Sequence, residues 1–156
     1  MTTTKVLFVC LGNICRSPLA EALFIKKSKK FKHAFEVDSA GTSDFHVGEL
    51  PDPRTIQNAL EHNLTLKHRA RQFKKEDFLR YDHIVAMDKS NLENVLKFAQ
   101  NQEDKDKVKL LRDFDHSHPG ADVPDPWFGG DEGFEEVYQI IDHCTQQLFE
   151  VLKKNI

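Results

Sequence analysis

The sequence predicts an α/β fold, an open parallel sheet with helices on both of its faces. Short, continuously apolar segments of strand length alternate with longer stretches in which apolar residues recur at helical spacing. This alternation is typical of parallel sheets whose strands are buried by helices on both sides. The length of 156 residues fits one domain, which we expect to cover residues 1–156.

The first half of the chain contains two predicted strands. Residues 6–10 are apolar without interruption, as expected of a central strand. Ser17 and Pro18 are suited to the cap and first turn of the helix that follows. Residues 35–39 form the second strand, and a further helix begins at Asp52. The apolar residues of that helix are Ile56, Ala59 and Leu60.

The second half contains two more strands, at residues 84–87 and 108–111, which brings the predicted sheet to four. The helix between them carries Leu92, Val95, Leu96 and Ala99. Residues 112–132 form a polar loop with three prolines, and a loop this long in a compact domain is often functional. The last helix has one apolar stripe, made of Phe134, Val137, Ile141, Cys144, Leu148 and Val151.

Composition and charge exclude several classes of protein. A net charge of −3 argues against a nucleic-acid binder, and no apolar run approaches the roughly 20 residues of a membrane span. Three cysteines are too few for a disulfide scaffold, and the start does not resemble a signal peptide, so we expect a cytoplasmic protein. Residues 1–80 hold fourteen Lys and Arg against nine Asp and Glu, whereas residues 81–156 hold eight against sixteen. An anion site is therefore expected in the first half.

The segment after the first strand is the best candidate for that site. Cys10 ends the strand, and ligands of open parallel sheets bind beyond the carboxyl ends of the strands. Gly12 and Asn13 tolerate the left-handed backbone needed to make the N–H groups of a short loop converge. Converging amides and a helix N-terminus bind phosphate without a metal. The predicted phosphate-binding residues are Leu11, Gly12, Asn13, Ile14, Cys15, Arg16 and Ser17.

Three side chains give this loop its chemistry. Arg16 can return its guanidinium to the same point and bind two oxygens of a tetrahedral oxyanion. The same positive field favours the thiolate form of Cys10, which is the nucleophilic form, and Ser17 can donate a hydrogen bond to the sulfur. No Gly-Lys-Ser/Thr follows, so the loop is not a nucleotide-binding P-loop.

Residues 9–21, Val-Cys-Leu-Gly-Asn-Ile-Cys-Arg-Ser-Pro-Leu-Ala-Glu, resemble the signature of the low-molecular-weight protein tyrosine phosphatases. The similarity continues at residues 38–42, 48–54, 68–71, 86–88 and 125–126. The resemblance implies a four-stranded parallel sheet and hydrolysis of phosphotyrosine and small aryl phosphates through a phosphocysteine. It also implies competitive inhibition by inorganic oxyanions. No metal and no other cofactor is expected.

The leaving oxygen of a phosphate ester needs a proton, and the long loop offers four aspartates. Asp113, Asp115 and Asp122 compete with Asp125, which is the best candidate because a proline on each side stiffens its backbone. The resemblance implies that Asp125 is the general acid of the first step and the base that activates water in the second.

Further residues receive roles from the resemblance. It implies a substrate rim formed by Leu11, Phe45, His46, Trp127 and Phe128, although the last two could instead anchor the core. Many family members carry two phosphorylatable tyrosines where this chain has Trp127 and Phe128, so that regulation is not expected. Asn13, Ser17, Ser39 and His68 match positions that hold the loop in shape by hydrogen bonding.

The two remaining cysteines differ in expected role. The resemblance implies that Cys15 can trap an oxidised Cys10 as a disulfide, and a buried structural cysteine is the alternative. Cys144 lies on the apolar stripe of the last helix and is expected to pack there. The acidic and histidine residues at 113–118 are interpreted as a solvated loop, because no second cluster supports a metal site.

Three other functions share the loop chemistry. A protein-arginine phosphatase typically has threonine where this chain has the apolar Ile14, which favours an aryl ester. An arsenate reductase needs additional redox cysteines, which Cys144 alone does not supply. A phosphocysteine carrier of a sugar phosphotransfer system would need neither Arg16 nor a water-activating Asp125.

Overall fold

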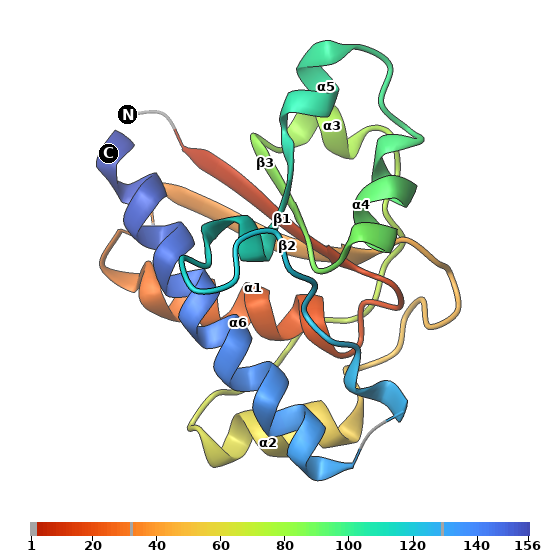
Figure 1. Cartoon of the computed structure of the whole chain (residues 1–156), viewed down its shortest axis with the longest axis vertical. Helices are drawn as coiled ribbons and strands as arrows, with labels where there is room; N and C mark the ends of the chain where they lie inside the picture. The colour runs from red at the N-terminus through yellow and green to blue at the C-terminus, as the bar shows by residue number, and fades with distance from the viewer. Residues whose placement is uncertain (1–2, 32, 129) are drawn as a thin grey trace.

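A computed structural model describes residues 3–31, 33–128 and 130–156 of the chain. Its sheet has four strands in the order β2-β1-β3-β4, and all three pairings are parallel, as the sequence predicts (Figure 1). The strands are β1 (Thr4–Cys10), β2 (Phe35–Gly41), β3 (His83–Ala86) and β4 (Val108–Leu110).

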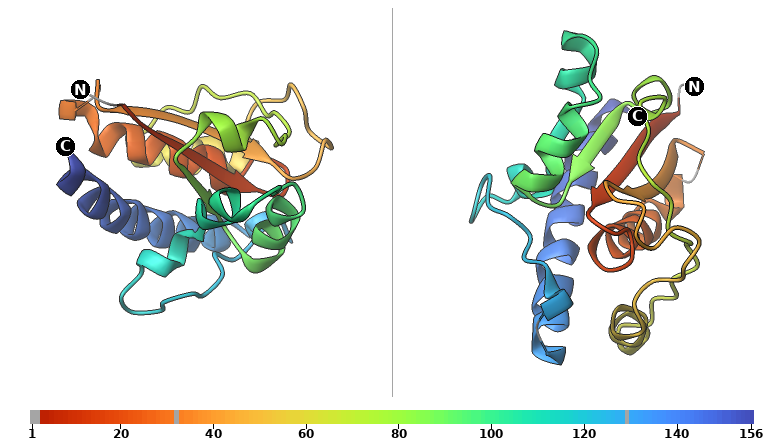
Figure 2. Two further views of the ribbon diagram at one scale, coloured as in Figure 1. Left: turned by 90° about the horizontal axis from the view of Figure 1, so that it is seen from above. Right: turned by 90° about the vertical axis from the view of Figure 1, so that its right-hand side faces the viewer.

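Helices lie on both sides of this sheet, which confirms the predicted fold class (Figure 2). The α-helices are α1 (Arg16–Lys27), α2 (Pro53–Glu61), α3 (Asp77–Arg80), α4 (Lys89–Leu96), α5 (Gln102–Asp106) and α6 (Asp131–Leu152). Single 3₁₀ turns cover Lys29–Phe31, Leu111–Phe114, Pro126–Phe128 and Lys153–Asn155. The sequence did not predict α3 and α5. Among the described residues, no helix combines the length and apolar character that crossing a bilayer demands.

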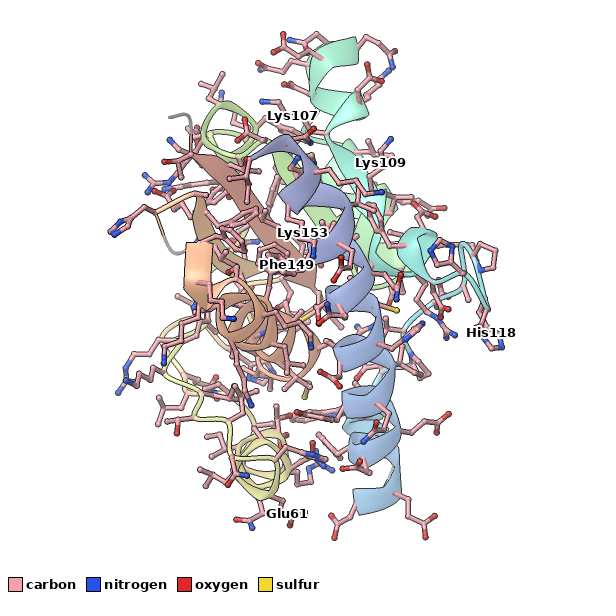
Figure 3. The ribbon with its side chains drawn as sticks, turned by 90° about the vertical axis from the view of Figure 1, so that its left-hand side faces the viewer. Glu61, Lys107, Lys109, His118, Phe149 and Lys153 are labelled. Carbon is pink, nitrogen blue, oxygen red and sulfur yellow. The ribbon has the colours of Figure 1, made fainter. Side chains whose placement is uncertain are left out.

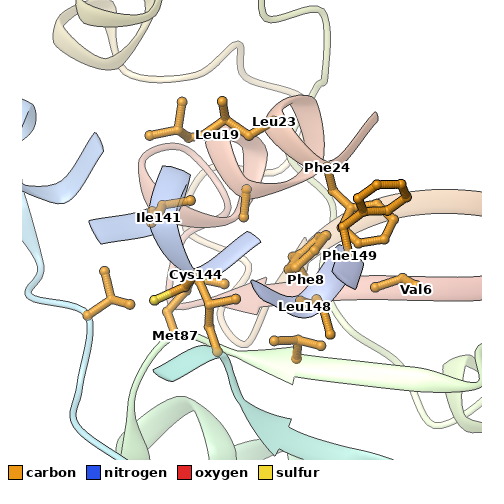
Figure 4. Packing of buried hydrophobic residues seen from close by; sticks show 14 of the residues in the cluster. Val6, Phe8, Leu19, Leu23, Phe24, Met87, Ile141, Cys144, Leu148 and Phe149 are labelled. Carbon is orange, nitrogen blue, oxygen red and sulfur yellow. The ribbon is translucent and has the colours of Figure 1, made fainter. Parts of the chain in front are cut away.

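Strand β1 is buried on both faces because its residues alternate between two hydrophobic clusters. Val6, Phe8 and Cys10 pack with α1 and α6, whereas Leu7 and Val9 pack with residues of α3, α4 and β4. Figure 4 shows the first cluster, in which Cys144 lies among aliphatic and aromatic side chains. Cys144 is therefore a packing residue, as predicted.

Two apolar positions were predicted wrongly. Leu60 on α2 is 49% exposed and Val151 on α6 is 44% exposed. Because an α-helix has 3.6 residues per turn, a stripe that follows a seven-residue repeat drifts around the helix. The buried stripe of α6 therefore passes from Leu148 to Leu152. Helix α2 has only nine residues, too few for this drift, and its buried residues are Thr55 and Ala59.

The strand order places the loop after β1 at a topological switch point. The chain leaves β1 for β2 on one side and later reaches β3 on the other, so the adjacent connections diverge there. The segment 112–128 returns to this edge, where the Val123 amide donates to the Met87 carbonyl oxygen at 2.8 Å. The loop after β1 and the segment around Asp125 therefore share one edge of the sheet.

Candidate active site

Cys10 lies at the floor of a cavity of about 210 Å³. The residue is 2% exposed, and its sulfur lies 3.0 Å from Ser17 Oγ. The backbone N–H of Asn13 donates to the same sulfur at 3.3 Å. Helix α1 begins at Arg16, with Cys15 as its N-cap, so the expectation that Ser17 caps this helix is wrong. The Ser17 hydroxyl instead contacts the Cys10 sulfur, as predicted for its second role.

Arg16 lies beside Cys10, and its side chain is 2% exposed. Its Nη1 donates to Asp88 Oδ2 at 2.7 Å and to the Val123 carbonyl oxygen at 2.9 Å. Burial opposes the charge on Arg16, but Cys10 and Asp88 outweigh it and raise the pKa of the guanidinium. Asp88 also caps α4 through the Asn91 amide, so one carboxylate fixes both a helix start and the arginine.

Asn13 organises the loop from within. Its φ of +59° lies in the left-handed region, as predicted for this position. Its Nδ2 donates to Ser17 Oγ at 2.8 Å and to Ser39 Oγ at 3.0 Å. Its Oδ1 accepts from His68 Nε2 at 2.7 Å and from the Arg71 amide at 3.0 Å. The four predicted supporting residues are thus connected through one buried amide.

Behind the side-chain amide of Asn13 lies a layer of hydrogen-bonded side chains, and the sequence did not predict that all of them belong to the site. Ser39 Oγ donates to Glu21 Oε1 at 2.5 Å, and His68 Nδ1 lies 3.2 Å from the same oxygen. Burial raises the pKa of Glu21 to about 7, and burial lowers the pKa of His68. Both shifts favour a neutral Glu21–His68 pair.

Glu21, Asp38 and His68 could together offer three ligands to a metal ion, since one atom from each lies within 4.8 Å of the others. Arg71 already supplies a cation here, because its Nε donates to Asp38 Oδ2 at 3.0 Å. The cluster is accounted for by hydrogen bonds that hold the loop.

Asp125 stands at the mouth of the cavity. Its Oδ2 lies 3.6 Å from Arg16 Nη2, and its side chain is 36% exposed. Its Oδ1 accepts from the Trp127 amide at 3.1 Å, which fixes the carboxylate relative to the following turn. Asp113, Asp115 and Asp122 do not line the cavity, so Asp125 is the only one of the four competing aspartates that does.

Four of the five predicted rim residues lie around the same opening. Leu11, Phe45, His46 and Trp127 line the cavity, and Phe45 is 73% exposed. The ring centroids of His46 and Trp127 are 5.7 Å apart. Arg54 donates to the Trp127 carbonyl oxygen at 3.3 Å and lies over its ring, which holds the turn in place. The side chain of Phe128 lies outside the described residues.

Two glycines allow other parts of the chain to approach the loop after β1 closely. A Cβ on Gly41 would lie 2.7 Å from the Leu11 carbonyl oxygen, so β2 can pass the loop only because this residue has no side chain. A Cβ on Gly12 would lie 2.9 Å from His46 Cδ2. The rim histidine and the loop backbone are therefore in direct contact.

The other cysteine of the loop, Cys15, lines the same cavity and is 7% exposed. Burial raises the pKa of the Cys15 thiol to about 12, so this sulfur is protonated at neutral pH.

The residues 113–118 form no part of the site. Figure 3 places His118 on a loop that projects from the body of the protein. Asp115 is buried and accepts hydrogen bonds from Arg112 and from the backbone of Ser117, which explains its burial.

The fold and this site define a class of protein. A cysteine at the end of the first strand, a loop of amides, a buried arginine and a nearby aspartate are the parts of a cysteine-dependent phosphatase.

Comparison with known proteins gives the family. The family described as low molecular weight phosphotyrosine protein phosphatase matches residues 5–156. A low molecular weight protein-tyrosine-phosphatase of Streptomyces coelicolor is 41% identical, over 99% of this chain and 96% of its own length. The human low molecular weight phosphotyrosine protein phosphatase is 42% identical over 95% of each chain. A crystal structure of a protein tyrosine phosphatase from Entamoeba histolytica superposes with a TM-score of 0.92 at 34% identity, covering 98% of this chain and 99% of that one. The chain belongs to the low molecular weight phosphotyrosine protein phosphatase family.

Replacing Glu21 by glutamine tests the buried pair. The raised pKa means that the folded protein favours the protonated form of Glu21. The stability that this carboxyl contributes is therefore present below pH 4.5 and is lost as the pH rises towards 7. The unfolding free energy of Glu21→Gln, minus that of the wild type, should therefore increase between pH 4.5 and 7, by at most about 1.4 kcal/mol per pH unit. Urea denaturation at several pH values measures this difference, and Glu61→Gln on the exposed end of α2 is the control. A difference that does not vary with pH would contradict the raised pKa.

Proposed function

We propose that this chain, as one domain of residues 1–156, hydrolyses phosphotyrosine in proteins, and small aryl phosphates, through a phosphocysteine on Cys10. The observation that carries the proposal is the juxtaposition of Cys10, Arg16 and Asp125 around one cavity. Membership of the phosphatase family supports the same reaction.

In the first step, the Cys10 thiolate attacks phosphorus and the bond to the ester oxygen breaks. Arg16 and the N–H groups of residues 11–17 bind the phosphate oxygens, where negative charge is concentrated in the transition state. Asp125 gives its proton to the leaving phenolate, and its position at the mouth of the cavity supports this role.

In the second step, the Asp125 carboxylate takes a proton from water, which attacks the phosphocysteine and displaces the Cys10 thiolate. The Ser17 hydroxyl at 3.0 Å and the Asn13 amide at 3.3 Å stabilise the departing sulfur. Apart from the substrate and this water, the proposed reaction uses only groups of the chain.

The shape of the cavity supports an aromatic ester. Trp127, Phe45, Leu11 and Ile14 give the cavity apolar walls. These walls suit a phenyl ring whose phosphate reaches Cys10. Inorganic oxyanions such as phosphate would occupy the same amides and Arg16, and so compete with substrate.

The test is a comparison of matched peptides carrying phosphotyrosine, phosphoserine or phosphoarginine. We expect kcat/KM to be highest for phosphotyrosine, by at least about tenfold, because only that ester fills the apolar walls. Preference for phosphoarginine, or arsenate reduction in a parallel assay, would replace this function by one of the alternatives of the same fold.

Asn13→Ala should lower kcat roughly 10–100-fold, because it removes four side-chain hydrogen bonds that hold the loop amides. Asn63 is a matched control, since it has a φ of +60° on an exposed turn away from the cavity. Steady-state kinetics with para-nitrophenyl phosphate measure both variants. If Asn63→Ala lowered kcat by the same factor, the loss in Asn13→Ala would reflect placing alanine at a positive φ and not the loss of the four hydrogen bonds.

We propose that Cys15 protects Cys10 during oxidation. Peroxide converts the Cys10 thiolate to a sulfenic acid, and the Cys15 thiol then displaces water to form a disulfide, which dithiothreitol reduces. The shared cavity supports this step. Cys15→Ala should regain less activity than the wild type after peroxide and dithiothreitol, with Cys144→Ala as control. Equal recovery in wild type and Cys15→Ala would contradict the proposal.

We also propose a cytoplasmic location. Cys10, Cys15 and Cys144 are all free thiols, and a nucleophilic thiolate is best preserved where glutathione and thioredoxin keep cysteines reduced.

A further inference from the structure

A second hollow, of about 830 Å³, lies between α1, the start of β2 and the segment 63–68 that follows α2. This segment runs back towards the sheet on the side of α1 away from α6 (Figure 2). The hollow shares no lining residue with the cavity above Cys10. We call it the α1 groove.

The walls of the α1 groove are mainly apolar. They include Ile25, Phe35, Val37 and Leu64, and the Ile25 side chain is 47% exposed. An exposed isoleucine beside a hollow of this size leaves apolar surface in contact with water. An elongated apolar body would cover this surface.

The rim of the groove is positively charged. Lys26, Lys29 and Lys67 line it and are all exposed. Lysine–carboxylate ion pairs within the described residues involve Lys27, Lys89 and Lys153 instead, which leaves the charges of the rim available. Charge complementarity therefore favours an anionic head group at the rim.

The floor of the groove connects to the phosphate-binding loop. Glu21 and His68 line the groove, and His68 Nε2 donates to Asn13 Oδ1 at 2.7 Å. Glu21 accepts from Ser39, which in turn accepts from Asn13. Two hydrogen-bonded connections thus run from the floor to the residue that shapes the loop around Cys10.

We propose that the α1 groove binds a free amphiphilic carboxylate, a single acyl chain with one anionic head, and that occupation lowers the turnover of the phosphatase site. The acyl chain lies on Ile25 and Leu64, and the carboxylate meets the rim lysines. Contact with His68 and Glu21 shifts the hydrogen bonds that hold Asn13, and the loop amides lose their alignment with the transition state. The effect on turnover rests on the proposed function, whereas binding does not.

Dodecanoate, below the concentration at which it forms micelles, is the probe. Titration calorimetry should show one site, and occupation should lower kcat for para-nitrophenyl phosphate at least about threefold with KM unchanged, since the two hollows are separate. Lys26→Glu/Lys29→Glu should raise the Kd of dodecanoate at least about tenfold while leaving basal kcat intact. Lys75→Glu/Lys105→Glu changes the net charge equally at exposed positions outside the groove and should leave the Kd unchanged.

Several outcomes would overturn the proposal. Equal binding of dodecyltrimethylammonium, or a Kd that the Lys26→Glu/Lys29→Glu substitution leaves unchanged, would show that the rim charges do not select the ligand. Competition between dodecanoate and inorganic phosphate would place the ligand at the active site. Co-sedimentation with phosphatidylserine vesicles without binding of free dodecanoate would assign the surface to a membrane. Binding of dodecanoate in the calorimeter without a change in kcat would refute the coupling between the α1 groove and the phosphatase site. Absence of turnover in the unliganded protein would refute the proposed function but not the binding of dodecanoate.

Discussion

Cys10→Ser is expected to abolish phosphate-ester hydrolysis, with a loss in kcat of roughly 10⁴-fold or more. The sulfur lines the cavity, lies 3.0 Å from Ser17 Oγ and accepts a hydrogen bond from the Asn13 amide at 3.3 Å. A serine hydroxyl at the same place has a far higher pKa than a thiol, and the two groups that contact the Cys10 sulfur, the Ser17 hydroxyl and the Asn13 amide, are not bases. The nucleophile is therefore removed while the geometry of the loop is preserved.

Oxyanion binding should survive this substitution, because Arg16 and the loop amides remain. Turnover of para-nitrophenyl phosphate in the presence of EDTA measures the first effect, and calorimetric titration with inorganic phosphate measures the second. Cys144→Ser removes a thiol from the packed face of α6 and should retain the activity of the folded protein. Turnover that persists in Cys10→Ser would exclude a phosphocysteine intermediate.

The sequence predicts the strands of this fold because buried parallel strands are apolar on both faces. Val6 to Val9 alternate between the two clusters, so no polar residue interrupts the run. The short α3 and α5 lack this signal, since a helix of four or five residues is too short to show a period. Their ends are fixed by contacts such as the Asn101 side chain accepting from the Asp104 amide.

The site is predicted from sequence where its residues are local, and missed where they are distant. The loop from Cys10 to Ser17 is one continuous segment, and its amides and arginine can be inferred from spacing. Asp88 holds Arg16 from 72 residues away, so its role depends on the pairing of β1 with β3. An aspartate just after a predicted buried strand, on the edge shared with Cys10, is the signal that could have found it.

The sequence indicates no role in the site for Glu21 or Arg71. Both act through Asn13, Ser39 and His68 in a hydrogen-bonded layer that unites β2, α1 and the segment after α2. Neither residue has a distinctive spacing from Cys10, because the contacts arise only when the sheet is assembled. Local sequence patterns therefore do not predict a layer of this kind.

Asp125→Ala is expected to lower kcat/KM by roughly 10²–10⁴-fold for esters with basic leaving groups. Asp125 lines the cavity with its side chain 36% exposed, and in the proposed mechanism the ester oxygen leaves on this side as sulfur bonds to phosphorus. A phenolate with a high pKa departs slowly without a proton, whereas para-nitrophenolate needs little assistance. The loss should therefore grow with the pKa of the phenol across a series of aryl phosphates.

Asp122→Ala separates this role from a structural one. Asp122 lies three residues earlier in the same loop, is exposed, and accepts from the Lys89 amide at 3.0 Å without lining the cavity. Removing the Asp122 carboxylate can disturb the loop, but it does not remove the group that gives a proton to the leaving oxygen. Because kcat/KM reports the steps up to formation of the phosphocysteine, the slope of log kcat/KM against leaving-group pKa isolates proton donation. A steeper slope in Asp125→Ala alone identifies the general acid, and a uniform loss across the series would make Asp125 a residue that only positions Arg16 and Trp127.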